Sequence, residues 1–147
     1  MKSEGWYPDI INFALSLAAY MQRKRICEGD FMELKCDNEH EVLFIHDAMY
    51  GRTMDASVCP GIDRTPTTDC ISWNSVERVQ LFCQHQHECK IGVSMESFLV
   101  EPCEGVNKYL DVNYTCGIYE PTIDDVCKYA NKNQYIRRSQ VQILDGQ

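Results

Sequence analysis

The sequence lacks both a membrane-spanning stretch and the common catalytic fingerprints. Its apolar run at residues 10–21 is too short for a transmembrane helix. The GxSxG nucleophile elbow, the HExxH metal motif, the phosphate-binding P-loop and the dinucleotide fingerprint are all missing. Cys127 has no motif around it that would make it a nucleophile. These absences predict a protein that is not an enzyme and uses no cofactor.

Positive charge is scarce as well. The chain has 14 Lys and Arg against 22 Asp and Glu, and residues 27–116 hold 16 of the acidic residues but only 6 of the basic ones. Long-range repulsion from such a domain disfavours nucleic acid, heparin-like polyanions and anionic membranes. We therefore expect no nucleic-acid partner.

Cysteine, by contrast, is abundant. Eight of nine cysteines fall between Cys27 and Cys116, without repeated CxxC pairs, in a chain of 147 residues that has room for one domain. This pattern indicates a disulfide framework made in an oxidising compartment, and hence an extracellular protein. The CxHxHxC run from Cys83 to Cys89 has the residue types of a zinc site, but its spacings are wrong and bridged cysteines cannot bind metal. We predict no metal.

The first 26 residues form a separate lead-in. Apolar residues recur at helical spacing after Pro8-Asp9, which predicts a capped amphipathic helix over residues 1–26. Acidic residues precede the apolar run and the basic residues 23–25 follow it, the reverse of a signal peptide. We therefore expect a secretion signal upstream of this chain.

The remaining pattern predicts a mainly β domain. Residues 41–52 are apolar on both faces, which is typical of a central strand, and residues 110–116 alternate like a half-buried strand. We also expect short strands within residues 27–36 and 90–93, a loop over 53–70, a helix over 72–83 capped by Ser72 or Ser75, and an irregular connection over 94–100.

Residues 101–108 are the predicted recognition loop. Cys103 pins the loop, which then closes into the strand that ends at Cys116, and loops on rigid scaffolds commonly carry binding residues. Polar groups next to Gly or Cys anchors form a candidate pocket for sugar hydroxyls: Glu28, Tyr50, Arg52, Glu101 and Lys108. In it a Glu accepts, the Lys donates and the Tyr supplies an apolar face. A set of solvated loop residues is the equal alternative.

The order CEG (27–29), YGR (50–52), PC (102–103) and KYLDVNYTC (108–116), with eight cysteines, resembles the SUEL-type galactose/rhamnose-binding lectin domain over residues 27–116. The resemblance implies an α+β fold: a compact antiparallel β-sandwich with one longer and one shorter helix and four disulfides. The pairs that it implies are Cys27–Cys59, Cys36–Cys116, Cys70–Cys103 and Cys83–Cys89, one of the 105 arrangements that eight cysteines allow.

The resemblance also implies a carbohydrate site. Sugar contacts are expected from Glu28, Tyr50, Gly105 and Lys108, and from an Asp before the PC pair. In this chain Glu101 replaces that Asp, and Asn107 stands where Tyr is common. A displaced carboxylate leaves polar groups unpaired, which weighs against monosaccharide binding. The candidate carbohydrate-binding residues are Glu28, Tyr50, Glu101, Gly105, Asn107 and Lys108.

Within the family, the chain with its lead-in looks most like the first lectin domain of Eva-type receptors. These receptors act in Slit axon guidance. Latrophilin ectodomains are the next most similar. This resemblance implies a non-catalytic recognition domain of a cell-surface receptor, working through glycan or protein contacts. A soluble rhamnose- or galactose-binding lectin is the alternative.

Two features lie at the C-terminal side. Asn113 is a sequon for N-glycosylation and faces outward in the predicted strand. Residues 117–147 read as a polar tail, or as the truncated start of a second repeat, since Val126-Cys127 stands 100 residues after Ile26-Cys27.

Overall fold

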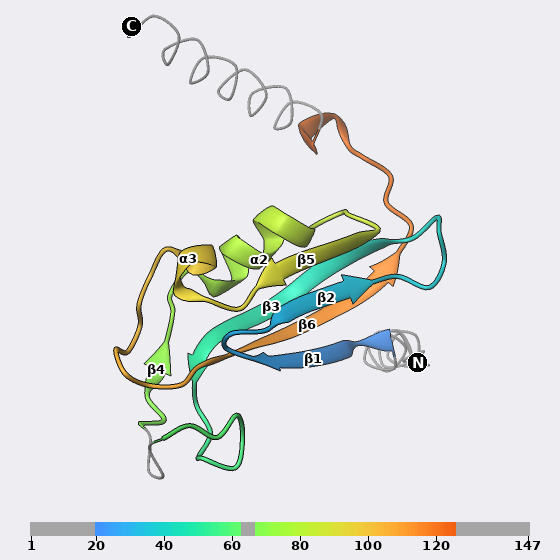
Figure 1. Ribbon diagram of the computed structural model, residues 1–147. Helices are drawn as coiled ribbons and strands as arrows, with labels where there is room; N and C mark the ends of the chain where they lie inside the picture. The colour runs from blue at the N-terminus through green and yellow to red at the C-terminus, as the bar shows by residue number, and fades with distance from the viewer. Residues whose placement is uncertain (1–19, 63–66, 126–147) are drawn as a thin grey trace, which may run out of the picture.

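Two antiparallel sheets and two helices make up the part of the chain that the computed structural model describes, residues 20–62 and 67–125 (Figure 1). The larger sheet has the order β1 (Gln22–Cys27), β6 (Tyr109–Gly117), β3 (Val42–Arg52) and β4 (Cys70–Ile71). The smaller sheet pairs β2 (Phe31–Lys35) with β5 (Glu88–Gly92). Helix α2 (Ser75–Cys83) is the longer and α3 (Met95–Phe98) the shorter. The predicted α+β fold is confirmed.

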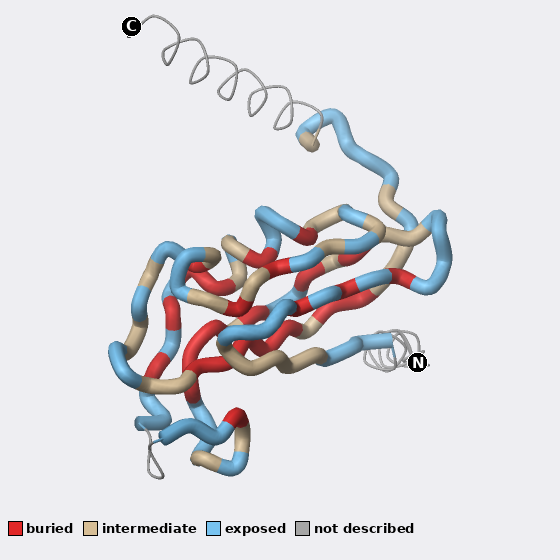
Figure 2. The backbone as a smooth tube through the Cα atoms, in the orientation of Figure 1, coloured by how far each residue is buried: buried red, intermediate tan, exposed pale blue. Residues whose placement is uncertain are grey.

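The core lies between the larger sheet and a layer made by the smaller sheet and α2. Figure 2 shows the buried stretches running along β3 and β6. Leu43 and Ile45 of β3 and Leu110 of β6 belong to one apolar cluster with Met32 of β2 and Val79 of α2. The strand predicted as central, residues 41–52, is therefore observed as β3 between β6 and β4, with a β-bulge between Ile45 and Asp47.

The lead-in helix predicted to run to residue 26 is wrong for residues 22–26, which belong to β1. Every residue of β1 pairs with β6, and Arg23 and Arg25 reach Asp111, 88 and 86 residues away. No local pattern reveals so distant a partner. Residues 1–19 of the predicted helix lie outside the described residues, as do residues 126–147 with Cys127. The predicted tail begins inside β6, and Tyr119 stacks on His85 with ring centroids 3.6 Å apart.

Strand β6 is buried on both faces, not on one as its alternation predicts. Asp111 and Thr115 point away from the core, yet both are buried because side chains from neighbouring strands cover them. The arginines of β1 lie over Asp111, and His46 Nε2 of β3 is 2.7 Å from Thr115 Oγ1. Asn113, between them, stays partly exposed.

The start of α2 is also different from the prediction. The helix begins at Ser75 after Asn74, with no side-chain cap. Ser75 Oγ instead donates to the carbonyl of Ser72 (2.7 Å) and accepts from the backbone N–H of Tyr50 (2.9 Å). The serine therefore ties the helix to β3 and does not cap it. Helix α3 lies in the predicted irregular connection, and β4 lies at the end of the predicted loop.

Four disulfides link the described residues: Cys27–Cys59, Cys36–Cys116, Cys70–Cys103 and Cys83–Cys89. These are the pairs that the family resemblance implies. The last bridge pairs Cys83 with Cys89, so neither is free as a thiolate to bind zinc in the CxHxHxC run. The first and third hold loops at the end of the larger sheet where β1 stops and β6 starts. Within the described ranges, no helix has the length and apolar character to cross a membrane.

Candidate functional site

The candidate site forms where three strands of the larger sheet meet loops. Glu28 directly follows β1, Lys108 directly precedes β6, and Tyr50 lies near the end of β3. The backbone N–H of Glu28 donates to the carbonyl of Lys108 (2.9 Å), which extends the β1–β6 ladder by one step. The sheet register therefore brings these distant residues together.

A buried ammonium group is the centre of the site. The Lys108 side chain is 4% exposed, and its Nζ lies 2.9 Å from Glu101 Oε1, 3.0 Å from the Val106 carbonyl and 3.4 Å from Glu28 Oε1. The first two distances lie within hydrogen-bond range, and the third is that of a longer ion pair. Two carboxylates around one ammonium leave the cluster with a formal charge of −1.

The Glu28 carboxylate is held from beneath. Its Oε1 accepts from the Tyr50 hydroxyl at 2.6 Å, and its Oε2 accepts from the backbone N–H of Lys108 at 3.1 Å. Tyr50 is fully buried and stacks on Phe98 with ring centroids 4.3 Å apart. Burial, and then the hydrogen bond to Glu28, raise the pKa of Tyr50, so its hydroxyl remains a donor. Tyr50 thus positions Glu28 and offers no exposed apolar face, contrary to the sequence-based expectation.

Arg52, also predicted as a sugar contact, organises the loops instead. It is buried and donates five hydrogen bonds, all to backbone carbonyls, including those of Asn107 and Cys59 at 2.6 Å each. Its Nη1 contacts the carbonyls of Met54, Asp55 and Val58. Arg52 therefore fixes the loop after β3 against the recognition loop.

A pocket of about 470 Å³ opens beside this cluster. Four of the six predicted site residues line it, whereas Tyr50 and Glu101 contact the cluster from outside the lining. The lining residues are Glu28, Arg52, Gly61, Ile62, Gly105, Val106, Asn107 and Lys108. Gly105 has φ +75°, and a Cβ there would meet no atom within 4 Å, so its backbone faces open space.

Sequence reasoning missed the wall formed by Gly61 and Ile62. Asn107 Nδ2 donates to the carbonyls of Cys59 (3.0 Å) and Pro60 (3.3 Å), and a Cβ on Gly61 would lie 2.9 Å from the Cβ of Asn107. The Pro60-Gly61 turn was the one local signal for this wall, but it gives no information about the distant Asn107.

The arrangement offers hydrogen-bond acceptors to a ligand. Among the described residues, Glu28 Oε2 accepts one hydrogen bond and Glu101 Oε2 accepts none. A carboxylate oxygen has two lone pairs, so both retain capacity for hydroxyl donors. Over those same residues, no three His, Cys, Asp or Glu side chains gather as a metal site.

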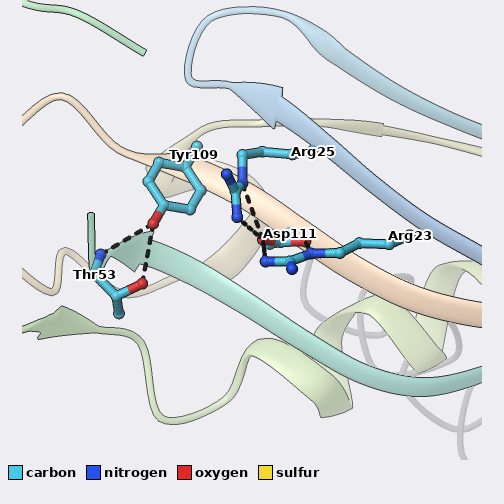
Figure 3. A network of polar contacts seen from close by, with 5 residues as sticks. All are labelled: Arg23, Arg25, Thr53, Tyr109 and Asp111. Carbon is cyan, nitrogen blue, oxygen red and sulfur yellow. Dashed lines mark hydrogen bonds and ion pairs between the residues drawn. The ribbon is translucent and has the colours of Figure 1, made fainter. Parts of the chain in front are cut away.

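A second polar cluster lies on the outer face of the larger sheet (Figure 3). Asp111 accepts four hydrogen bonds from Arg23 and Arg25. Burial alone would raise the pKa of Asp111, but the hydrogen bonds and charges of the two arginines outweigh it and hold the pKa below its usual value. The Arg25 guanidinium also lies 4.9 Å from the centre of the Tyr109 ring, whose hydroxyl accepts from the Thr53 N–H at 3.1 Å. This cluster joins β1 to β6.

Comparison with known proteins identifies the relatives of this chain. The family model described as "D-galactoside/L-rhamnose binding SUEL lectin domain" matches residues 34–116. The D-galactoside-specific lectin of Heliocidaris crassispina is 35% identical over 98 residues, which cover 65% of this chain and 90% of that lectin.

Two similar proteins are much longer. Protein eva-1 homolog C of Homo sapiens is 35% identical over 99 residues, covering 65% of this chain and 22% of that protein. The human latrophilin adhesion G protein-coupled receptor L1 is 29% identical over 100 residues, 68% of this chain and 7% of the receptor. The resemblance drawn from the sequence motifs is therefore confirmed, and the chain belongs to the D-galactoside/L-rhamnose binding SUEL lectin domain family.

Proposed function

We propose that this chain is a non-catalytic, extracellular recognition domain that binds a monosaccharide in the pocket beside Glu28 and Lys108. One observation carries the proposal. The Glu28 carboxylate is fixed by Tyr50 and Lys108 and lines an open pocket with acceptor capacity to spare. The four disulfides support an oxidising, extracellular compartment.

The chemistry suits a sugar because its hydroxyls donate to carboxylates through charge-assisted hydrogen bonds. The acceptor is preorganised, so little entropy is lost when it is ordered by a ligand. The pocket is open and small, and a monosaccharide makes few contacts. We therefore expect a dissociation constant in the millimolar range, which corresponds to a binding free energy of about −4 kcal/mol.

L-rhamnose and D-galactose are the first ligands to test, because the family description names both sugars. The chain matches nearly the full length of a lectin but less than a quarter of protein eva-1 homolog C. A domain of a larger receptor and a soluble lectin are both consistent with the same pocket.

Protein contact is the second candidate function, and an exposed apolar pair favours it. Ile71 and Trp73 flank the buried Ser72 and are 58% and 80% exposed. Such a pair fits a protein partner of a receptor, including one of the Slit type that the Eva-type resemblance implies.

The test is an NMR titration of the whole chain with L-rhamnose and D-galactose. Glu28→Gln should weaken binding about tenfold, since it removes one charge-assisted hydrogen bond. Glu33→Gln is the matched control, because Glu33 carries the same charge but pairs with Lys90 on the smaller sheet, 2.6 Å away. Equal affinity in the wild type and Glu28→Gln would contradict the proposed site. No binding of either sugar at tens of millimolar would leave protein contact as the function.

We further propose an N-glycan at Asn113. Its side chain is partly exposed on the outer face of the larger sheet, with Arg23 and Asp47 as cross-strand neighbours. This face is separate from the pocket, so a glycan there leaves the pocket open. Protein secreted from eukaryotic cells should lose mass on treatment with peptide N-glycosidase, and Asn113→Gln should not. An unchanged wild-type mass would contradict the glycan.

A further inference from the structure

We infer that Glu101 limits how strongly Lys108 can contact a ligand, because its carboxylate makes the shortest of the three contacts to the ammonium group. The inference rests on the proposed sugar-binding function and names the residue that sets its affinity and ligand chemistry. It also assigns Glu101 a role different from direct sugar contact.

Two of the three acceptors around Lys108 are fixed by the fold. The Val106 carbonyl belongs to the backbone two residues before the lysine, 3.0 Å from Nζ. Glu28 is held by Tyr50 from below and by the backbone N–H of Lys108. Glu101 is the third acceptor and the shortest contact at 2.9 Å. It comes from the loop, so it is the acceptor that a substitution can remove without changing the sheet.

The Glu101 carboxylate is itself held in place by two donors. Its Oε1 accepts from Lys108 Nζ and also from the backbone N–H of Cys103, 3.1 Å away. The disulfide from Cys103 to Cys70 fixes that backbone. The side chain is 30% exposed, whereas that of Lys108 is 4% exposed. The carboxylate therefore covers the ammonium from the solvent side of the loop.

The length of the side chain at position 101 decides the contact. An Asp is one carbon–carbon bond shorter than Glu, about 1.5 Å. An Asp at this position can still accept from the N–H two residues on, which is the usual Asx-turn geometry. We expect an Asp that keeps this bond to lie farther from Lys108 Nζ than the 2.9 Å of Glu101. The Asp that the family resemblance implies would then engage the ammonium group less closely than Glu101 does.

The ligand chemistry follows from this closed arrangement. A sugar hydroxyl in the pocket can donate to Glu28 Oε2, but the Lys108 ammonium group that it meets is already engaged by Glu101. The wild-type pocket therefore favours sugars that present hydroxyl donors, and it binds them more weakly than a pocket with an open lysine.

The test compares three full-length chains in an NMR titration with L-rhamnose. Glu101→Asp should bind about tenfold more tightly than the wild type, the effect of one hydrogen bond to a charged group. Glu101→Gln is the matched control, because its amide oxygen occupies the same place and still accepts from Lys108. It should bind rhamnose more weakly than Glu101→Asp, because the ammonium group stays engaged by the longer side chain. Glu101→Ala is the second variant, in case the shorter acid distorts the loop. Its affinity for L-rhamnose should also exceed that of the wild type.

A second measurement needs no sugar: hydrogen exchange of the Lys108 ammonium, followed in 15N spectra. The wild type and Glu101→Gln should exchange slowly, and Glu101→Asp should exchange faster. Equal or weaker rhamnose binding by Glu101→Asp, with the wild type binding, overturns the inference. If no chain binds rhamnose, the proposed function fails, and the exchange rate alone decides. Faster exchange in Glu101→Asp then supports the role of Glu101, and an unchanged rate overturns it.

Discussion

The two buried ionic clusters of this domain are opposite in charge and different in purpose. At the end of the sheet, Lys108 sits between the carboxylates of Glu28 and Glu101. On its outer face, Asp111 sits between the guanidinium groups of Arg23 and Arg25 (Figure 3). The central charged side chains are nearly equal in burial, 4% and 8% exposed. Burial and ion pairing therefore do not distinguish a binding site from a structural joint.

Position in the fold distinguishes them. Arg23, Arg25 and Asp111 all lie within strands, where the sheet register of β1 and β6 fixes them. In the Lys108 cluster, Glu28 and Lys108 lie just beyond strand ends and Glu101 lies in a loop, and there the disulfide-held loops leave a pocket and an open glycine backbone. A binding site needs that open side, and a joint does not.

The largest effect is expected from Lys108→Met. This change leaves two neighbouring carboxylates, 24% and 30% exposed, without their buried cation, so the free energy of unfolding should fall by about 2 kcal/mol. Rhamnose binding should be lost as the carboxylates separate. Urea unfolding with the disulfides intact measures the first effect. Lys90→Met, at an exposed ion pair with Glu33, should cost less than about 1 kcal/mol. Equal losses for the two variants would show that Lys108 is not a buried centre.

A narrower effect is expected from Asp111→Asn, and only on stability. Arg23 is 61% exposed and keeps much of its hydration, so the loss should be about 2 kcal/mol at neutral pH. The dissociation constant for rhamnose should not change, because the Asp111 cluster lies away from the pocket. A weakened sugar affinity in Asp111→Asn would break the distinction between the two clusters.

The same variant should show a characteristic pH dependence. The arginines hold the pKa of Asp111 in the folded state below its ordinary value of 3.8. The stabilisation is therefore present above about pH 4 and is lost as the pH falls through the folded-state pKa. The gap in unfolding free energy between wild type and Asp111→Asn should be wide at pH 6 and narrower at pH 3. A difference in unfolding free energy that stays constant between pH 6 and pH 3 would show that the ion pairs of Asp111 are not its cause.

The sequence predicted elements whose signals are local. The apolar run of β3 and the helical spacing of α2 are both readable within one segment. Strand β1 was predicted as helix because its order depends on a register with β6, more than 80 residues away. The burial of Asp111 has the same cause, since the arginines that cover it come from β1. Long-range pairing, not local propensity, decides both.

For the site, family resemblance supplied the residues and the structure changed their roles. Glu28, Gly105, Asn107 and Lys108 line the pocket, and their role as sugar contacts stays a prediction. Tyr50 and Arg52 are buried supports whose donors are used within the protein. Hydrogen-bond saturation of this kind depends on coordinates and leaves no trace in residue type or spacing.

The most direct test of the account is one 15N NMR titration with L-rhamnose that reads both clusters in the same spectra. We expect saturable shifts in the backbone amides of Gly105 and Lys108. They should give a millimolar dissociation constant, which corresponds to a binding free energy of about −4 kcal/mol. The amides of Arg25 and Asp111 should not move. Shifts centred on Arg25 and Asp111, with Gly105 and Lys108 unchanged, would contradict the assignment of the binding site to the Lys108 cluster.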